Sequence, residues 1–185
     1  MNPFETLGLS PTFTLTPAEL EQRQRELNRA LHPDRHATKT PAERRRALSM
    51  AMDINQACRT LSDPAARADA LLALLGVDRH SAETVTDGAL LMDMLEQREN
   101  LEELRKSGAR DGLLELRRNM TERESQVLSK LGECFEVLLG AHDQGEARPL
   151  DTERSAGLAR AQRLLGELRY LRRLTEEAGA ILDEA

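Results

Sequence analysis

The chain has 185 residues, enough for one or two small domains, and 39% of them are hydrophobic while 31% are charged. The net charge of −6 and a pI of about 5.4 argue against a general nucleic-acid-binding role. No apolar run approaches the roughly 20 residues of a membrane span, and the first residues lack a signal-peptide pattern, so we expect a cytoplasmic protein without nucleic-acid or membrane partners.

The residue types favour helices over strands. Leu, Ala, Glu and Arg dominate, aromatic residues make up only 2%, and no segment alternates between apolar and polar residues for long enough to predict a strand. The two cysteines, Cys58 and Cys134, stand alone in helical patterns, which excludes a disulfide framework or a cysteine-rich zinc site and suits a reducing cytosol. We therefore predict an all-α fold, with both cysteines in the core.

Six of the seven prolines lie before residue 65, so the N-terminal part is divided into short helices, which we place at 3–8, 17–31, 41–61 and 64–75. The segments Thr16-Pro17-Ala18-Glu19 and Thr40-Pro41-Ala42-Glu43 repeat one helix-start pattern. In each, Thr caps the helix, Pro takes the first helical position and Glu completes a capping box.

The two central helices of this part carry apolar residues at helical spacing and should form an antiparallel hairpin. The expected buried stripes are Leu20, Leu27 and Leu31 on one helix, and Ala47, Met50, Ala51, Ile54, Ala57, Cys58 and Leu61 on the other. Residues 1–76 then form the first domain.

Residues 77–86 show no clear period and are predicted to be a linker. Three longer helices follow, at about 87–106, 110–141 and 150–183, and predict a C-terminal three-helix bundle over 87–185. Residues 1–75 carry 10 Lys or Arg and 9 Asp or Glu, whereas residues 76–185 carry 16 and 23. Two domains with such different charge suggest two different partners.

The tripeptide His32-Pro33-Asp34 follows directly on the helix that carries Arg25 and Arg29. Pro33 disfavours a helical conformation at His32, which places the tripeptide at a turn. An ordinary helix-ending turn would look the same. A metal site of His32, Asp34 and His36 is disfavoured because Pro33 breaks the helical ligand spacing and no third strong ligand is near. A Ser/His/Asp triad has no support in the sequence.

The context of the tripeptide resembles a J-domain, the module with which DnaJ-type co-chaperones stimulate DnaK-type ATPases. The matching residues are Phe4, Leu7, Gly8 and Leu9, the His32-Pro33-Asp34 motif, Ile54-Asn55-Gln56-Ala57, and Leu61 with Asp63 and Pro64. The resemblance implies that His32, Pro33 and Asp34 act on a DnaK-type chaperone. Gln24 and Ala30 depart from residues that many J-domains carry there, so Arg25 and Arg29 are the helix residues expected to dock it.

The second half of the chain narrows the resemblance to the HscB family, the J-type co-chaperones of bacterial iron–sulfur cluster assembly. The segments Arg67-Ala68-Asp69-Ala70-Leu71-Leu72 and Leu90-Leu91-Met92-Asp93-Met94-Leu95-Glu96-Gln97-Arg98-Glu99 carry it, and the Cys-x-x-Cys extension of eukaryotic relatives is missing. The resemblance implies an HscA-like chaperone and an IscU-like scaffold protein as partners. It implies no cofactor, no metal and no active site of the chain's own.

The helix predicted at 87–106 has two distinct faces. Leu90, Met94, Leu101 and Leu104 fall within about 80° of arc and should face the bundle. Met92, Glu96, Glu99 and Glu103 lie opposite, with Leu95 at their edge. A plain solvated face would explain the acids but not two large apolar side chains, so we favour a partner surface. The family resemblance assigns scaffold binding to Leu91, Met92, Leu95, Glu96, Glu99 and Glu103.

In the last helix the expected core residues are Leu158, Ala161, Leu164, Leu165, Leu168 and Leu171. Tyr170 lies off the centre of this stripe. It matches an aromatic position that HscB proteins use against the scaffold, and a boundary tyrosine packed on its own bundle explains it nearly as well.

Three other functions stay open from the sequence. The chain could be a J-domain co-chaperone for a different client. It could be a small metal-dependent hydrolase built on His32, Asp34, His36 and His80. It could also be a helical adaptor in which the His-Pro-Asp tripeptide occurs by chance.

Overall fold

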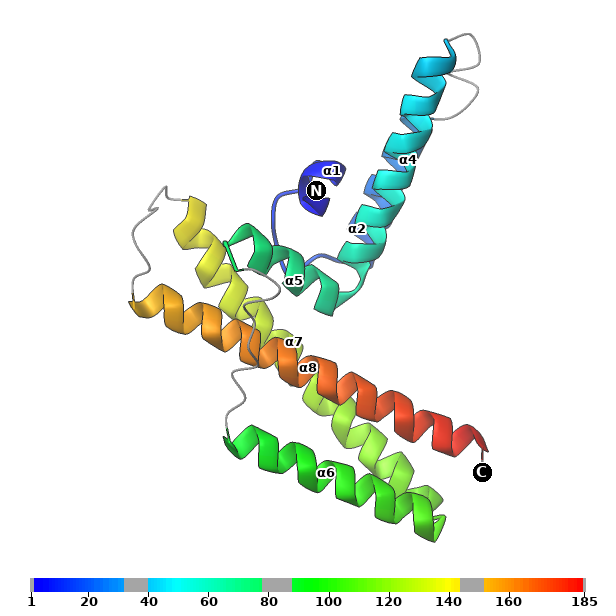
Figure 1. The fold of residues 1–185 in the computed structure, drawn as a ribbon, viewed down its shortest axis with the longest axis vertical. Helices are drawn as coiled ribbons and strands as arrows, with labels where there is room; N and C mark the ends of the chain where they lie inside the picture. Colours follow the sequence, from blue (N-terminus) through cyan, green and yellow to red (C-terminus); the bar gives the residue numbers. More distant parts are fainter. Residues whose placement is uncertain (1, 32–39, 78–87, 144–151, 185) are drawn as a thin grey trace. The chain divides into compact units, whose positions relative to one another are not determined.

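The structure, a computed structural model, describes residues 2–31, 40–77, 88–143 and 152–184, and every regular element in these ranges is an α-helix (Figure 1). The prediction of an all-α fold is confirmed. The chain divides into two compact units, Met1–Arg79 and His80–Ala185. The predicted linker, 77–86, lies outside the described residues except for Val77.

The N-terminal unit holds four helices, α1 (Pro3–Leu7), α2 (Pro17–Ala30), α4 (Pro41–Ser62) and α5 (Pro64–Leu74). Each begins with a proline, whose fixed φ suits the first helical position. Their bounds agree within one residue with the predicted ones.

Both predicted capping boxes are present at the helix starts. In the first, the amide of Glu19 donates to the Thr16 hydroxyl at 3.2 Å, and the amide of Thr16 donates to the Glu19 carboxylate at 2.9 Å. The second joins Thr40 and Glu43 in the same way, at 3.3 and 2.8 Å. Since a cap of this kind satisfies two otherwise unpaired amides, it fixes where each long helix of the hairpin begins.

The helices α2 and α4 run side by side as the predicted hairpin, and α1 lies beside the second half of α4 (Figure 1). The buried core of the unit comprises Phe4, Leu7, Phe13, Leu20, Ala47, Ile54, Ala57, Cys58, Leu61, Ala68, Leu71, Leu72 and Leu75.

The prediction that Met50 is buried was wrong, because its side chain is 47% exposed. Met50 lies on the buried side of the helical wheel. However, α1 has only five residues and its first residues line a pocket with Gln56 and Thr60, in the second half of α4. The start of α1 therefore lies beside the second half of α4, away from Met50.

Arg67 is the one buried charged residue in the described part of the chain, and it ties three segments of the N-terminal unit together. Its guanidinium donates to the carbonyl of Leu61 at 2.7 Å and to those of Phe13 and Leu15 at 2.6 and 3.2 Å. The cation also lies 5.9 Å from the centre of the Phe13 ring. Burial lowers the pKa of Arg67, and the nearby Asp63 carboxylate partly offsets this effect.

Replacing Arg67 by methionine should destabilise the N-terminal unit by about 2–4 kcal/mol, because buried carbonyls would lose their donor. Urea unfolding followed by circular dichroism measures the change. Arg59→Met, at an exposed position of α4, is the control and should stay within about 0.5 kcal/mol of the wild type. If the free energy of unfolding of Arg67→Met falls by less than about 1 kcal/mol, water replaces the hydrogen bonds of the guanidinium at little cost.

The C-terminal unit holds α6 (Gly88–Ser107), α7 (Arg110–Asp143) and α8 (Thr152–Glu184), within two residues of the predicted helices. All six predicted core residues of the last helix are buried, from Leu158 to Leu171. With 20 residues against 34 and 33, α6 is too short to follow the whole bundle. It lies along the first half of α7 and the second half of α8 (Figure 1).

The rest of α7 and α8 forms a two-helix hairpin. A Cβ atom added at Gly157 would lie 3.0 Å from a methyl carbon of Leu138, so the Leu138 side chain packs directly on Gly157. The thiol of Cys134 donates to the carbonyl of Gly157 at 3.4 Å. Both cysteines are free and buried, and burial raises the pKa of each thiol. Their predicted place in the core is confirmed.

Candidate functional site

The two arginines predicted to dock a chaperone lie on the outer face of α2. Arg25 and Arg29 are exposed, and helical spacing places them opposite the core residue Leu20. Arg25 forms an ion pair with Glu21 at 3.3 Å, and both side chains remain about two thirds exposed. An exposed pair of this kind contributes little to stability, so Arg25 can exchange Glu21 for another acidic partner at low cost.

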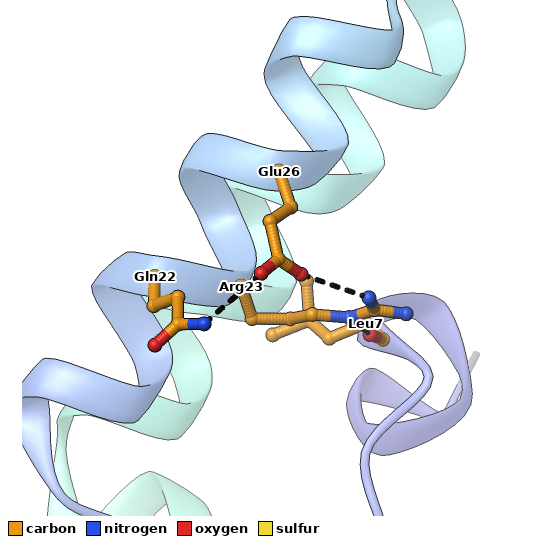
Figure 2. A network of polar contacts seen from close by, with 4 residues as sticks. All are labelled: Leu7, Gln22, Arg23 and Glu26. Carbon is orange, nitrogen blue, oxygen red and sulfur yellow. Dashed lines mark hydrogen bonds and ion pairs between the residues drawn. The ribbon is translucent and has the colours of Figure 1, made fainter.

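A third arginine of α2, Arg23, has a structural role (Figure 2). Its Nε donates to the carbonyl of Leu7 at 2.5 Å, and its Nη1 pairs with Glu26 at 3.2 Å. Hydrogen bonds from Gln22 and Arg23 lower the pKa of Glu26, which keeps this carboxylate charged. Arg23 thus fixes α1 against α2, on the side of α2 that faces away from Arg25.

This link also explains the glycine after α1. Gly8 ends the helix with φ of 61°, in the left-handed region that favours glycine. A Cβ atom at Gly8 would lie 2.6 Å from Nη2 of Arg23. The Gly8 predicted as part of the J-domain pattern therefore suits the left-handed turn and leaves room for the Arg23 side chain.

The residues His32, Pro33 and Asp34 lie outside the described residues, and their role stays a prediction. The same holds for His36 and His80, which the alternative of a metal-dependent hydrolase would use. Among the residues that the structure does describe, no three His, Cys, Asp or Glu side chains are grouped to hold a metal ion. In the same ranges, no helix is long and apolar enough to cross a membrane.

The outer face of α6 carries three large apolar side chains that point away from the bundle. Leu91, Met92 and Leu95 are 49%, 59% and 50% exposed. Three exposed acidic residues share this face, namely Glu96, Glu99 and Glu103. We call these six residues the α6 outer face.

The inner side of α6 also agrees with the helical wheel. Leu101 is buried, and the other predicted inward residues, Leu90, Met94 and Leu104, are half-buried. The predicted orientation of α6 is therefore confirmed, whereas a partner for its outer face stays a prediction.

Tyr170 of α8 is half-buried, and its hydroxyl donates to the backbone carbonyl of Met94 in α6. Burial raises the pKa of Tyr170, and the Asp93 carboxylate adds to this effect. A phenol held neutral in this way keeps the proton that it donates to α6. The structure thus shows Tyr170 packed on its own bundle, and a direct contact with a scaffold stays a prediction.

Sequence reasoning missed an ion-pair network between the three helices. Arg123 of α7 pairs with Asp93 of α6 at 2.5 Å and with Glu167 of α8 at 2.8 Å. Arg98 of α6 pairs with Glu177 of α8 at 2.7 Å. Burial alone would lower the pKa of Arg123, but the two carboxylates outweigh it and raise the pKa. One feature of the sequence could have indicated this network: Asp93 and Arg123 each lie beside the apolar stripe of their helix.

The chain is similar to known proteins over most of its length. A family model described as "HSCB C-terminal oligomerisation domain" matches residues 86–179. The chain is 32% identical over 184 residues to the "Co-chaperone protein HscB homolog" of Shewanella woodyi, which covers 99% of this chain and 98% of that protein.

Two solved structures are similar over nearly the whole chain. "Chaperone HscB from Vibrio cholerae" aligns with a TM-score of 0.72 at 29% identity, covering 100% of this chain and 99% of that one. Human co-chaperone HscB shares the fold at 23% identity, with a TM-score of 0.64, covering 97% of this chain and 81% of that one. HscB structures consist of a J-domain followed by a C-terminal helical domain. The chain therefore belongs to the HscB family of co-chaperones.

Proposed function

We propose that the protein stimulates the ATPase of a DnaK-type chaperone, HscA-like, and delivers an IscU-like iron–sulfur scaffold to it, which aids iron–sulfur protein maturation. The observation that carries this proposal is the α6 outer face, with three exposed apolar side chains beside three acids in a member of the HscB family. The ATP-hydrolysing residues belong to the chaperone.

The α6 outer face has the composition of a small protein interface. A few side chains at the centre of an interface, where water is excluded, provide most of the binding free energy. Charged residues at the rim contribute mainly to the association rate and to the choice of partner. Leu91, Met92 and Leu95 suit the first role, and the acids suit the second. We therefore expect the matching surface of the scaffold to be apolar with a basic border.

The chaperone contact belongs to the N-terminal unit in this proposal. His32, Pro33 and Asp34 shift the chaperone toward ATP hydrolysis, while Arg25 and Arg29 meet an acidic surface on it. Support comes from the exposure of both arginines on the outer face of α2. Two modest affinities on one chain raise the local concentration of client at the chaperone, which couples hydrolysis to client capture.

Calorimetric titration of the full-length protein with an IscU-like scaffold tests the client, and single-turnover ATPase assays with an HscA-like chaperone test the stimulation. Both should be positive. Stimulation without scaffold binding would favour a J-domain protein with another client. Absence of both would favour the helical adaptor.

Reversing both charges of α2, Arg25→Glu with Arg29→Glu, should raise the protein concentration needed for half-maximal ATPase stimulation by about tenfold. Added salt should reduce this difference between the variant and the wild type, since exposed charges are screened over about 8 Å at physiological ionic strength. Scaffold binding should stay unchanged.

Arg45→Glu with Arg46→Glu is the matched control, because it makes the same charge change at exposed positions of α4. An unaltered dose–response curve for the α2 variant would remove Arg25 and Arg29 from the docking surface. An equal shift in the control would also remove them, because it would indicate a general effect of net charge.

A further inference from the structure

The first half of α6 is held to the bundle by polar contacts rather than by a buried core. Leu101, in the second half, is the one fully buried side chain of α6. The apolar part of the α6 outer face, from Leu91 to Leu95, lies at the other end of the helix, where the inward Leu90 and Met94 are only half-buried. This end therefore gains little from hydrophobic burial and needs other contacts to keep its position.

Three polar links start from residues 93–98, in and just after the first half of α6. Asp93 pairs with Arg123, the carbonyl of Met94 accepts from Tyr170, and Arg98 pairs with Glu177. Asp93 follows Met92 directly, so the ion pair fixes the backbone at the centre of the outer face. Arg123 also donates from Nε to Glu167 of α8 at 2.9 Å, so α6 is tied through it to both other helices.

The guanidinium of Arg123 suits this role because its planar fork addresses two carboxylates at once. Its side chain is 28% exposed, and those of Asp93 and Glu167 are 34% and 17% exposed. Such partly buried pairs are less screened than surface pairs. The contact still leaves the α7–α8 core intact if it breaks, because the buried leucines of that core lie elsewhere.

We infer that Arg123 is a positioning residue for the α6 outer face: by joining Asp93 to Glu167, it holds Met92 and Leu95 in the arrangement that the scaffold protein binds. This inference rests on the proposed scaffold site. Without the link from Asp93 through Arg123 to Glu167, α6 also adopts positions in which the scaffold cannot bind the α6 outer face. The apparent dissociation constant is the intrinsic one divided by the competent fraction, so affinity falls as that fraction falls.

The test uses Arg123→Met in the full-length protein, which keeps the aliphatic bulk and removes the charge. If the competent fraction falls to about one fifth, scaffold affinity should weaken about fivefold, through slower association at an unchanged dissociation rate. Loss of a positive charge beside an acidic face would by itself speed association with a basic partner, so slower association has to come from position. Amide hydrogen exchange over residues 90–98 should rise roughly tenfold without the scaffold.

The matched control is Arg172→Met. Arg172 is also 28% exposed, and its ion pair with Glu124 at 2.7 Å joins α8 to α7. This variant should leave exchange in 90–98 and scaffold association unchanged. Arg123→Lys, which keeps the charge, should restore part of the association rate.

Unchanged exchange in 90–98 for Arg123→Met would overturn the inference. Unchanged scaffold affinity would also overturn it, provided that alanine at Met92 and Leu95 weakens binding. If alanine there has no effect, the proposed scaffold site itself fails and the positioning role falls with it. The exchange data then show separately whether Arg123 holds α6. An equal loss of affinity in Arg172→Met would assign the effect to general stability and would overturn the inference as well.

Discussion

Replacing Met92 and Leu95 together by alanine should weaken binding of the IscU-like scaffold more than tenfold. Truncating a central apolar anchor costs about 1–2 kcal/mol or more, and about 1.4 kcal/mol corresponds to a factor of ten. The loss should appear mainly as faster dissociation, measured by surface plasmon resonance. The free energy of unfolding should hold, because both side chains are at least half exposed in the unbound protein.

A matched control is available on another helix of the same unit. Leu114 and Val137 of α7 are 48% and 74% exposed, and neither lies on α6. Their double alanine variant removes similar exposed apolar groups and should bind the scaffold normally. Normal affinity of the Met92 and Leu95 variant would remove the α6 outer face from the scaffold site. A melting temperature several degrees lower would mean that these side chains stabilise the bundle.

Asp34→Asn should abolish stimulation of the chaperone ATPase while the fold stays intact. The motivation is its place in the His32-Pro33-Asp34 tripeptide, which follows α2 in the sequence of an HscB-family chain. Single-turnover ATPase assays measure the effect, and unfolding midpoints should match the wild type within about 0.5 kcal/mol.

Glu5→Gln is the matched control, since it removes one exposed negative charge from the same unit. It should stimulate the ATPase normally. Full stimulation by Asp34→Asn would contradict the proposed role of the His32-Pro33-Asp34 tripeptide. Loss of helical circular dichroism in that variant would instead assign Asp34 a structural role.

Most of the fold could be predicted from local signals in the sequence. A proline after a capping residue fixes a helix start, so the capping boxes at Thr16 and Thr40 placed α2 and α4 within one residue. The α6 outer face was also predictable, because a 20-residue helix with two apolar partners on one side buries only one stripe. These features depend on residues close together in the sequence.

Features that depend on tertiary contacts escaped prediction. Arg67 donates to the carbonyls of Phe13 and Leu15, more than 50 positions away. No local pattern shows that the segment between α1 and α2 packs against Arg67. The same applies to Arg123, whose two carboxylate partners come from two other helices. Met50 was placed in the core because periodicity gives the side of a helix but not the length of its neighbour.

Single-turnover ATP hydrolysis by an HscA-like chaperone, measured with this protein and with or without an IscU-like scaffold, tests the central claim most directly. The proposal predicts that the protein alone accelerates hydrolysis. It also predicts that adding the scaffold accelerates it further, and that the further increase disappears in the Met92 and Leu95 double alanine variant. A rate that the protein leaves unchanged, or a scaffold effect that persists in that variant, would contradict the account.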